Sequence, residues 1–271
     1  MKKREKLFNC PVVITGNCYF ASDFHLGAPN PIASADREKQ ILTWLDSIKN
    51  EVEHLFLLGD IFDFWFEYKH LIPKGFHNFL SKMDELKKSG VEIYFFTGNH
   101  DMWVGDFFTE QMGVHLFRKQ QLFVINGKKC LIGHGDGLGK GELGYKIIKF
   151  IFNCPVNRWL YSLLPPRIAF SIAYFFSRKS RAMMPAYMDI FLGEENESVV
   201  QYCKETSNQY PEIDFFIYGH RHIPLEIKIN QAIYFNTGDW ITHNSFLKLS
   251  EEERDGIEIY SKAKQCANPK L

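Results

Sequence analysis

The segment "VEIYFFTGNHDMW", residues Val91 to Trp103, places an amide, an imidazole and a carboxylate directly after an apolar run. Continuous apolar runs of this length, bounded by turn residues, are typical of strands buried between two layers. The side chains of Asn99, His100 and Asp101 therefore fall where such a strand ends. They form either a polar turn that ends the strand or one part of a larger site, and the rest of the chain decides between these interpretations.

The same pattern recurs along the chain. Short apolar runs lead into polar or glycine-containing clusters at five further places: "CYFAS" before Asp23, "HLFLL" before Gly59, "KKCLIG" before His134, "DFFIY" before Gly219 and "AIYF" before Asn236. Helical patterns lie between the first runs, since "ADREKQILTWLDSIKN" puts Ile41, Leu42, Leu45 and Ile48 on one face and "HNFLSKMDELKKSG" ends in a glycine suited to a helix C-cap. In "LFVINGKKCLI" the Asn-Gly pair predicts a hairpin turn. Together these elements predict an α/β fold, a layered sandwich with mixed sheets.

From about residue 139 to 210 the pattern becomes helical and apolar, with almost no strand signal. We interpret residues 139–210 as a helical lid inserted into a core made of residues 1–138 and 211–260. Residues 261–271 are expected to be a C-terminal tail.

Composition limits the class of protein. The chain has 271 residues, and its 32 basic side chains equal its 32 acidic ones, so no overall field favours nucleic acid as a partner. Its 6 cysteines include no CxxC pair, which favours a reducing cytoplasm over a disulfide scaffold. We find no signal peptide, and no apolar run approaches the roughly 20 residues of a membrane span. A cytoplasmic enzyme is the expectation.

Polar clusters at the strand ends share histidine, aspartate and asparagine. They contain Asp23 and His25, Asp60 and Asp63, Asn99 and His100, His134 and Asp136, and His220 and His222. Any one cluster is more simply a turn. An α/β fold brings such strand ends to one edge of its sheets, where seven N and O donors could bind two divalent ions of manganese, iron, magnesium or zinc.

The ordered motifs D-x-H, GD-x-x-D, GNHD, GH-x-D and GH-x-H resemble those of the calcineurin-like metallophosphoesterases. The resemblance implies a four-layer αββα sandwich and hydrolysis of a phosphoester or phosphoanhydride. It implies that one ion is bound by Asp23, His25, Asp60 and His222, and the other by Asp60, Asn99, His134 and His220, with Asp60 bridging. His100 would donate to the phosphate or protonate the leaving oxygen, and Asp63 would orient His100. The alternative for Asp63 is a helix N-cap.

The insertion resembles the lid of the UDP-2,3-diacylglucosamine diphosphatases of lipid A biosynthesis. The similarity lies in "GYK" after "GHGD", in "W", "LP" and "R" along the lid, in "RKSR", and in the tryptophan of "GDIFDFW". The expected substrate contacts are Trp65, Tyr145, Arg178, Ser180 and Arg181. The alternative, a purely structural role, is that the apolar lid residues form a small core of their own.

That resemblance implies cleavage of UDP-2,3-diacylglucosamine at its α-phosphate to UMP and 2,3-diacylglucosamine 1-phosphate (lipid X), with two divalent ions, most typically Mn²⁺. It also implies a lipid-linked sugar-nucleotide as partner and peripheral association of a cytoplasmic protein with the inner membrane; no protein partner is inferred. One departure is His100, where the best-known members carry arginine. Two alternatives stay open: a less specialised phosphoesterase acting on soluble nucleotides or sugar-nucleotide diphosphates, and a non-catalytic scaffold, against which the intact donor set argues.

Overall fold

The computed structural model describes residues 11–28, 30–139, 149–152, 154–183, 190–251 and 256–260. One set of strands comprises β2 (Cys18–Ala21), β3 (His54–Leu57), β4 (Glu92–Phe96), β5 (His115–Phe117), β11 (Ser245–Leu249) and β12 (Gly256–Ile259). A second set comprises β1 (Val12–Ile14), β6 (Gln121–Ile125), β7 (Lys128–Ile132), β8 (Phe215–Tyr218), β9 (Pro224–Ile229) and β10 (Ala232–Thr237). Within the described residues each set forms one six-stranded sheet.

The strand order is β12-β11-β2-β3-β4-β5 in the first sheet and β1-β6-β7-β8-β10-β9 in the second. In the first sheet β2, β3, β4 and β5 are parallel, and β11 and β12 add antiparallel strands. In the second, β7, β8 and β10 are parallel, whereas β6 pairs antiparallel with β7 across the turn at Asn126 and Gly127. The predicted hairpin and the mixed sheets are therefore confirmed.

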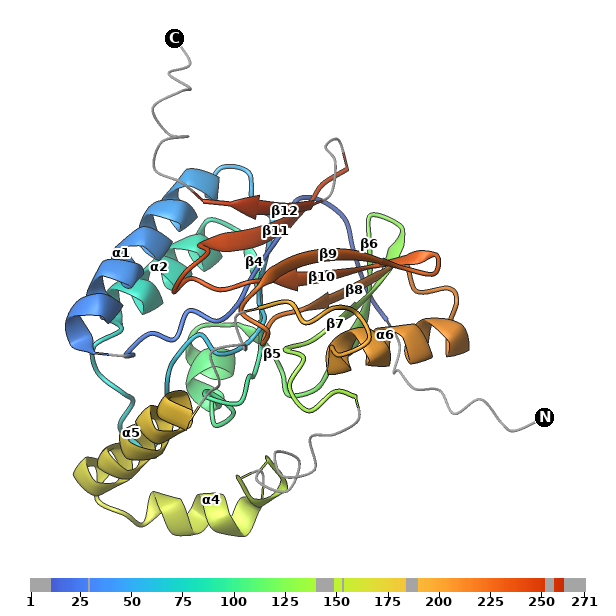
Figure 1. Cartoon of the computed structure of the whole chain (residues 1–271). Coiled ribbons are helices and arrows are strands. Elements are labelled where there is room, and N and C mark those ends of the chain that lie inside the picture. The colour runs from blue at the N-terminus through green and yellow to red at the C-terminus, as the bar shows by residue number, and fades with distance from the viewer. Residues whose placement is uncertain are drawn as a thin grey trace.

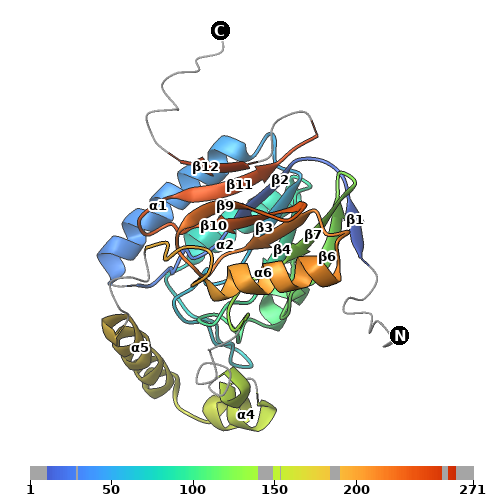
Figure 2. The ribbon, with the colours of Figure 1, turned by 45° about the vertical axis from the view of Figure 1, so that its right-hand side comes forward.

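Helices cover the outer faces of both sheets, while the inner faces pack against each other (Figures 1 and 2). Apolar side chains of the two sheets, among them Phe56, Phe96, Phe123 and Ile217, meet in a shared buried cluster. Helices α1 (Pro31–Ile48) and α2 (His77–Lys88) pack on the first sheet, and α6 (Ser198–Gln209) packs on the second. The order helix, sheet, sheet, helix is the predicted αββα sandwich.

Local chemistry sets the ends of the first helices. The side chain of Asn30 accepts a hydrogen bond from the main-chain nitrogen of Ala33 and caps α1. On the predicted apolar face of α1, Ile41, Leu45 and Ile48 are buried. Helix α2 ends before Gly90, which has a φ of 99°. The main-chain N–H of Gly90 donates a hydrogen bond to the carbonyl of Lys87. This left-handed position is the glycine C-cap that the sequence predicts.

Two helices of the predicted insertion, α4 (Pro155–Ser162) and α5 (Pro166–Met183), lie together at one end of the molecule, below the sheets in Figure 1. Helix α6 also falls within residues 139–210, but its buried side chains belong to the layer that covers the second sheet. The boundaries at 139 and 210 stay a prediction, and the tail at 261–271 lies outside the described residues. None of the described helices is both long and apolar enough to span a membrane.

The described part of the chain also contains a short π-helix, η1 (Phe107–Gln111), which follows the loop after β4. Its residue Phe108 is buried against the first sheet and contacts the rings of Trp65 and Phe95. This packing fixes the segment that leads away from the GNHD motif.

Candidate metal centre

The loops that carry the five motifs meet at the carboxyl ends of parallel strands from both sheets. Asp23 follows β2 and Asp60 follows β3, while His220 follows β8 of the other sheet. A hydrogen bond of 2.9 Å from the main-chain nitrogen of His220 to Oδ2 of Asp23 joins the loops of the two sheets. The sandwich therefore places its polar strand ends around one point, as α/β folds do.

Several of these loop residues have a left-handed backbone conformation that side chains other than glycine rarely adopt. The φ angle is 56° at Asp23, 43° at His25, 53° at Asp60, 70° at His220 and 56° at His222. Each such residue costs of order 1–3 kcal/mol unless its surroundings hold it in place. Five of them in one cluster mark it as a functional site, because strain of this kind is retained where it positions reactive groups.

The first group of donors is formed by Asp23, His25 and His222. Nε2 of His222 lies 3.2 Å from Oδ1 of Asp23 and 3.3 Å from Nε2 of His25, and Nε2 of His25 lies 3.8 Å from Oδ1 of Asp23. Ligand atoms of the three residues lie within 4.8 Å of one another. Oδ1 of Asp23 is buried and accepts no hydrogen bond from the described part of the chain. A carboxylate oxygen and two imidazole nitrogens therefore converge, as the ligands of a cation do.

The second group is formed by Asp60, His134 and His220, whose ligand atoms also lie within 4.8 Å of one another. Nε2 of His134 lies 3.5 Å from Oδ2 of Asp60 and 3.3 Å from Oδ1 of Asn99. Oδ2 of Asp60 is in turn 3.8 Å from Nε2 of His25, which belongs to the first group. Asp60 therefore lies between the two groups, and all seven predicted ligands are brought together.

Charges within the centre favour the ionised form of its carboxylates. Burial alone would raise the pKa of Asp60, but His134 and His100 beside it hold that pKa well below its usual value. Burial likewise opposes ionisation of Asp23, and His222 nevertheless lowers its pKa to about 2. Burial would lower the pKa of His134, but Asp60 raises it to about 10. Buried anionic oxygens with neighbouring imidazoles, and no thiolate, form a donor set that fits divalent cations such as Mn²⁺, Fe²⁺, Mg²⁺ or Zn²⁺.

His100 lies at the rim of the centre. Its Nδ1 is 3.0 Å from the main-chain oxygen of Asp63 and 3.5 Å from Oδ1 of that residue. Its main-chain nitrogen donates to Oδ1 of Asp60 at 2.8 Å. The structure thus brings Asp63 and His100 together. The N-cap alternative for Asp63 is wrong, because residues 61–76 contain no helix.

Asp101 has a structural role, because it fixes the turn that follows β4. Its carboxylate is fully buried and accepts hydrogen bonds from the main-chain nitrogens of Gly98 (2.7 Å), Ile61 (2.8 Å) and Phe62 (3.4 Å). It therefore ties the loop after β4 to the loop after β3. Burial, followed by the charge of Asp60, raises the pKa of Asp101 to about 7.

Two contacts support the imidazoles from outside. Nδ1 of His134 lies 2.7 Å from the main-chain oxygen of Leu58, an arrangement that leaves Nε2 facing the centre. Oδ2 of Asp239 lies 3.8 Å from Nδ1 of His222, and its Oδ1 accepts from the main-chain nitrogen of His243 at 2.9 Å. The sequence analysis missed Asp239, although it stands in "NTGDW" directly after a strand, the same signal that marks the other clusters.

The residues expected to contact substrate do not cluster as the predicted metal ligands do. Trp65 is fully buried and packs against Phe62, and its indole nitrogen donates to Oε1 of Glu67 at 2.9 Å. It therefore packs in the core under the first sheet instead of facing a substrate surface. Arg178 is exposed on α5. Tyr145 lies outside the described residues, as do the side chains of Ser180 and Arg181.

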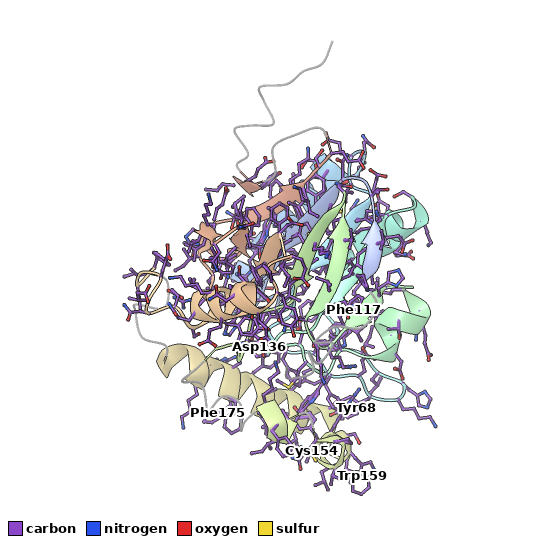
Figure 3. The ribbon with its side chains drawn as sticks, turned by 90° about the vertical axis from the view of Figure 1, so that its right-hand side faces the viewer. Tyr68, Phe117, Asp136, Cys154, Trp159 and Phe175 are labelled. Carbon is purple, nitrogen blue, oxygen red and sulfur yellow. The ribbon has the colours of Figure 1, made fainter. Side chains whose placement is uncertain are left out.

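The apolar residues of the insertion are largely exposed. Figure 3 shows Trp159 and Phe175 projecting away from the sheets. The exposed fraction is 59% for Trp159, 61% for Leu163 and 62% for Phe175. Ala169 and Ser177 are the buried residues on the described part of α5. The alternative that the sequence left open was a small core formed by the apolar residues of the insertion. These side chains do not form such a core within the described part of the insertion.

Aromatic side chains anchor α4 and α5 to the core. The ring of Tyr161 lies 4.8 Å from that of Trp103, which follows the GNHD motif, and 4.9 Å from that of Phe66. The phenol of Tyr68 donates to the main-chain oxygen of Leu164 at 3.1 Å. The described segment that contains α4 and the start of α5 is therefore held beside the metal centre on one side, while its other side faces solvent.

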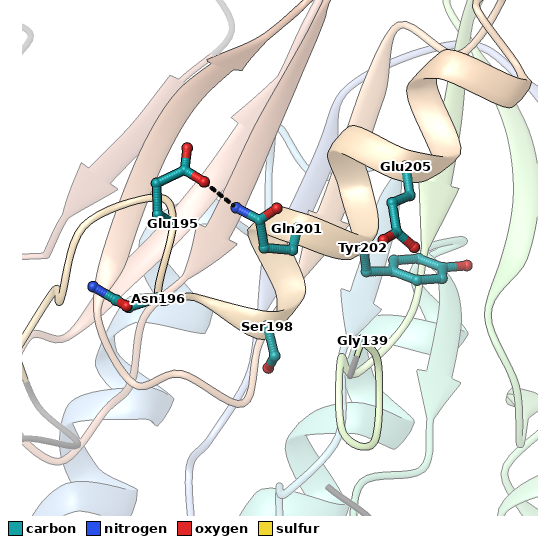
Figure 4. A pocket seen from close by; sticks show the side chains of 7 residues that line it. All are labelled: Gly139, Glu195, Asn196, Ser198, Gln201, Tyr202 and Glu205. Atoms are coloured by element: carbon teal, nitrogen blue, oxygen red, sulfur yellow. Dashed lines mark hydrogen bonds between the residues drawn. The ribbon is translucent and has the colours of Figure 1, made fainter. Parts of the chain in front are cut away.

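A separate pocket of about 240 Å³ lies at the start of α6 (Figure 4). Its lining residues are Gly139, Glu195, Asn196, Ser198, Gln201, Tyr202 and Glu205. None of these is a predicted site residue. The converging donors, and not this polar hollow, identify the functional site.

Comparison with known proteins agrees with this geometry. The family model described as Calcineurin-like phosphoesterase matches residues 17–224. A UDP-2,3-diacylglucosamine hydrolase of Porphyromonas gingivalis is 35% identical over 240 residues, which cover 84% of this chain and 92% of the relative. Similarly named proteins of Photorhabdus laumondii and Escherichia coli are 26% and 27% identical, each over 89% of this chain and 98% of its own length.

The matched region contains all five motifs, and the family is one whose members use divalent metal ions. The two groups of aspartate and histidine ligands, the αββα sandwich and the match over most of the chain lead to one conclusion. The chain belongs to the calcineurin-like phosphoesterase family.

Proposed function

We propose that this chain hydrolyses UDP-2,3-diacylglucosamine at the α-phosphate and releases UMP and 2,3-diacylglucosamine 1-phosphate. As a member of its family the chain is a metal-dependent hydrolase. The proposed substrate is inferred from the similarity to the hydrolase of Porphyromonas gingivalis. This similarity extends over 92% of that relative and so includes the insertion as well as the metal centre.

The proposed ligands of one cation are Asp23, His25, Asp60 and His222. Those of the other are Asp60, Asn99, His134 and His220, with Asp60 shared. Its position between the two groups supports this role. We propose Mn²⁺ as the metal because the resemblance to the UDP-2,3-diacylglucosamine diphosphatases implies it. The imidazole nitrogens and carboxylate or amide oxygens, without thiolate, are compatible with this ion. Two bound divalent cations would supply an activated water molecule and neutralise charge on the phosphoryl oxygens.

In the proposed reaction the oxygen of water bonds to the α-phosphorus while the bond from that phosphorus to the bridging oxygen breaks. The bridging oxygen leaves with the sugar phosphate. His100 lies at the rim, and its side chain is 15% exposed. With Nδ1 directed at the main-chain oxygen of Asp63, Nε2 is the atom available to hold or deliver the proton that the leaving oxygen takes up.

The insertion is proposed to bind the acyl chains. Burying one large apolar side chain against lipid contributes about 1.5–3 kcal/mol, and α4 and α5 present several such side chains to solvent. Arg178 and Lys179 are exposed on α5 and suit an anionic phosphate or headgroup. We propose that Tyr145, Ser180 and Arg181 add substrate contacts. The same surface would associate peripherally with the cytoplasmic face of the inner membrane.

The test is turnover by purified, manganese-loaded protein. We expect UMP to be released from UDP-2,3-diacylglucosamine in mixed micelles. Release of no UMP from this substrate, combined with cleavage of bis(p-nitrophenyl) phosphate by the same preparation, would refute the substrate while leaving the reaction class intact. Detergent-free turnover of UDP-sugars at least as fast as that of the lipid would favour the soluble-substrate alternative.

A further inference from the structure

A hydrogen bond joins the insertion to the catalytic rim. The hydroxyl of Ser177 on α5 lies 3.1 Å from Oδ1 and 2.9 Å from Oδ2 of Asp63. Both residues are buried, with 8% of Ser177 and 3% of Asp63 exposed. A hydroxyl that reaches both oxygens of a buried carboxylate donates a charge-assisted hydrogen bond and fixes the direction in which the carboxylate points.

Asp63 in turn contacts two imidazoles of the centre. Its main-chain oxygen lies 3.0 Å and its Oδ1 3.5 Å from Nδ1 of His100. The same Oδ1 lies 3.8 Å from Nδ1 of His25, whose ring centroid is 4.8 Å from that of His100. A shift of the Asp63 carboxylate therefore changes the surroundings of the residue proposed to protonate the leaving group.

The other side of α5 faces solvent next to this contact. Phe175 and Phe176 directly precede Ser177 and are 62% and 59% exposed. One short stretch of helix thus presents an apolar surface outward and a buried hydroxyl toward Asp63. A ligand on the apolar surface therefore contacts the same turn of helix that carries the hydroxyl of Ser177.

We propose that Ser177 is a positioning residue that couples the insertion to catalysis through Asp63 and His100. Acyl chains on the outer surface of α5 hold the helix against the core, Ser177 then orients Asp63, and Asp63 orients His100. The acyl part of this inference rests on the proposed function, whereas the Ser177–Asp63–His100 link does not. The simpler role, satisfying a buried carboxylate, predicts a loss of stability without a specific loss of turnover.

The primary experiment measures kcat and KM of Ser177→Ala for UDP-2,3-diacylglucosamine and for bis(p-nitrophenyl) phosphate. Loss of one hydrogen bond to a charged group corresponds to about a 10- to 100-fold effect. We expect kcat to fall by that factor for both substrates while KM changes less than about 3-fold. Ser177→Thr, which keeps the hydroxyl, should retain wild-type kcat. Ser171→Ala is the matched control, because Ser171 is exposed on the same helix and its hydroxyl donates to the carbonyl of Arg167, a residue of that helix.

A double-mutant cycle with Asp63→Ala tests the route. If Ser177 acts through Asp63, Ser177→Ala should have less than about a 2-fold effect in the Asp63→Ala background. An equal effect in both backgrounds, or unchanged kcat in Ser177→Ala, would overturn the inference. If Ser177→Ala does not fold, Ser177→Cys keeps the volume but donates weakly, and the same outcomes apply to it.

A crystal structure of Ser177→Ala gives a readout independent of turnover. A displaced or doubled position of the His100 imidazole would support the coupling, and an unchanged single position would overturn it. The proposed function fails separately, through wild-type protein that releases no UMP from the lipid substrate. In that event the effect of Ser177→Ala on diester cleavage still decides whether the residue positions His100.

Discussion

Nε2 of His222 lies 3.2 Å from Oδ1 of Asp23, although the two residues follow strands of different sheets. This contact closes the metal centre across the sandwich, since Asp23 follows β2 and His222 follows β8. The site therefore depends on how the two sheets pack, and its response to mutation or to loss of metal should report on that packing.

Removing divalent cations should abolish hydrolysis and lower stability. Asp23 and Asp60 are buried carboxylates that need positive charge nearby. A cation present at 100 times its Kd stabilises the fold by about 2.7 kcal/mol, so EDTA should lower Tm by several degrees. Differential scanning calorimetry with and without EDTA measures this change. Readdition of Mn²⁺ should restore both properties, and a Tm insensitive to EDTA would contradict the assigned ligands.

Asp239→Asn should weaken metal binding while preserving the fold. The substituted side chain keeps an oxygen that accepts hydrogen bonds from the main-chain nitrogens of Thr242 and His243. It removes the negative charge beside Nδ1 of His222. Loss of such a supporting carboxylate costs about 10- to 100-fold in metal affinity. Isothermal titration calorimetry with Mn²⁺ measures the dissociation constant and checks this factor. Asp36→Asn on the exposed side of α1 is the control, and equal affinity in the two variants would rule out the support.

Gly98→Ala should disrupt the centre. A Cβ atom on Gly98 would lie 2.2 Å from Oδ1 of Asp60 and 2.6 Å from its main-chain nitrogen. Because the neighbouring backbone cannot yield, we expect activity to fall by at least about 100-fold and stability by about 1–3 kcal/mol. Gly256→Ala is the matched control, since its nearest atom is 3.7 Å away. Urea unfolding and diester hydrolysis measure both effects, and wild-type behaviour of Gly98→Ala would show that Asp60 is not held in place there.

His100→Ala should lower kcat with little change in KM. Removing a positioned acid typically costs 10²- to 10⁴-fold, and the same range is expected here. His100→Arg tests the departure from the best-known diphosphatases, since arginine supplies a permanent charge but no transferable proton. Steady-state kinetics on a good and a poor leaving group distinguish the roles. If His100 protonates the leaving oxygen, the loss should be larger for the poor leaving group, and an equal loss would instead indicate charge stabilisation.

Paired substitutions of exposed apolar residues should weaken lipid binding alone. Trp159→Ser with Phe175→Ser removes two side chains whose burial contributes about 1.5–3 kcal/mol each. We expect binding to phosphatidylglycerol vesicles to fall at least about 100-fold and KM for the lipid substrate to rise, without change in diester hydrolysis. Val13→Ser is the control, since Val13 is 69% exposed but lies outside the insertion. Sedimentation with vesicles measures binding, and unchanged binding would assign the apolar surface another role.

Much of the fold could be read from local patterns. The apolar run before Asn99 is a buried strand, the Asn126-Gly127 pair forms the hairpin turn, and Gly90 ends α2. Each of these features depends on side-chain period or on the backbone preference of one residue, so neighbours in sequence suffice to define it. The clustering of the seven candidate ligands followed from one more rule, that parallel strands end at a common edge.

Other features depend on contacts between distant residues. Trp65 was expected at a substrate surface, yet it is buried, because Phe62 and Phe108 pack around it. The position of Asp239 after a strand can be read from the sequence. Its contact with His222, and the contact of Ser177 with Asp63, cannot, because both join residues of separate segments.

The sequence by itself determined the kinds of secondary structure, the order of the polar clusters and the chemistry of their donors, since all of these reside in short segments. Only the tertiary structure decided which side chains are buried, which carboxylate supports which imidazole, and which surface of the insertion faces outward. The physical reason is that burial and hydrogen-bond partners are set by the packing of two sheets and their helices, and such packing is a property of the whole chain.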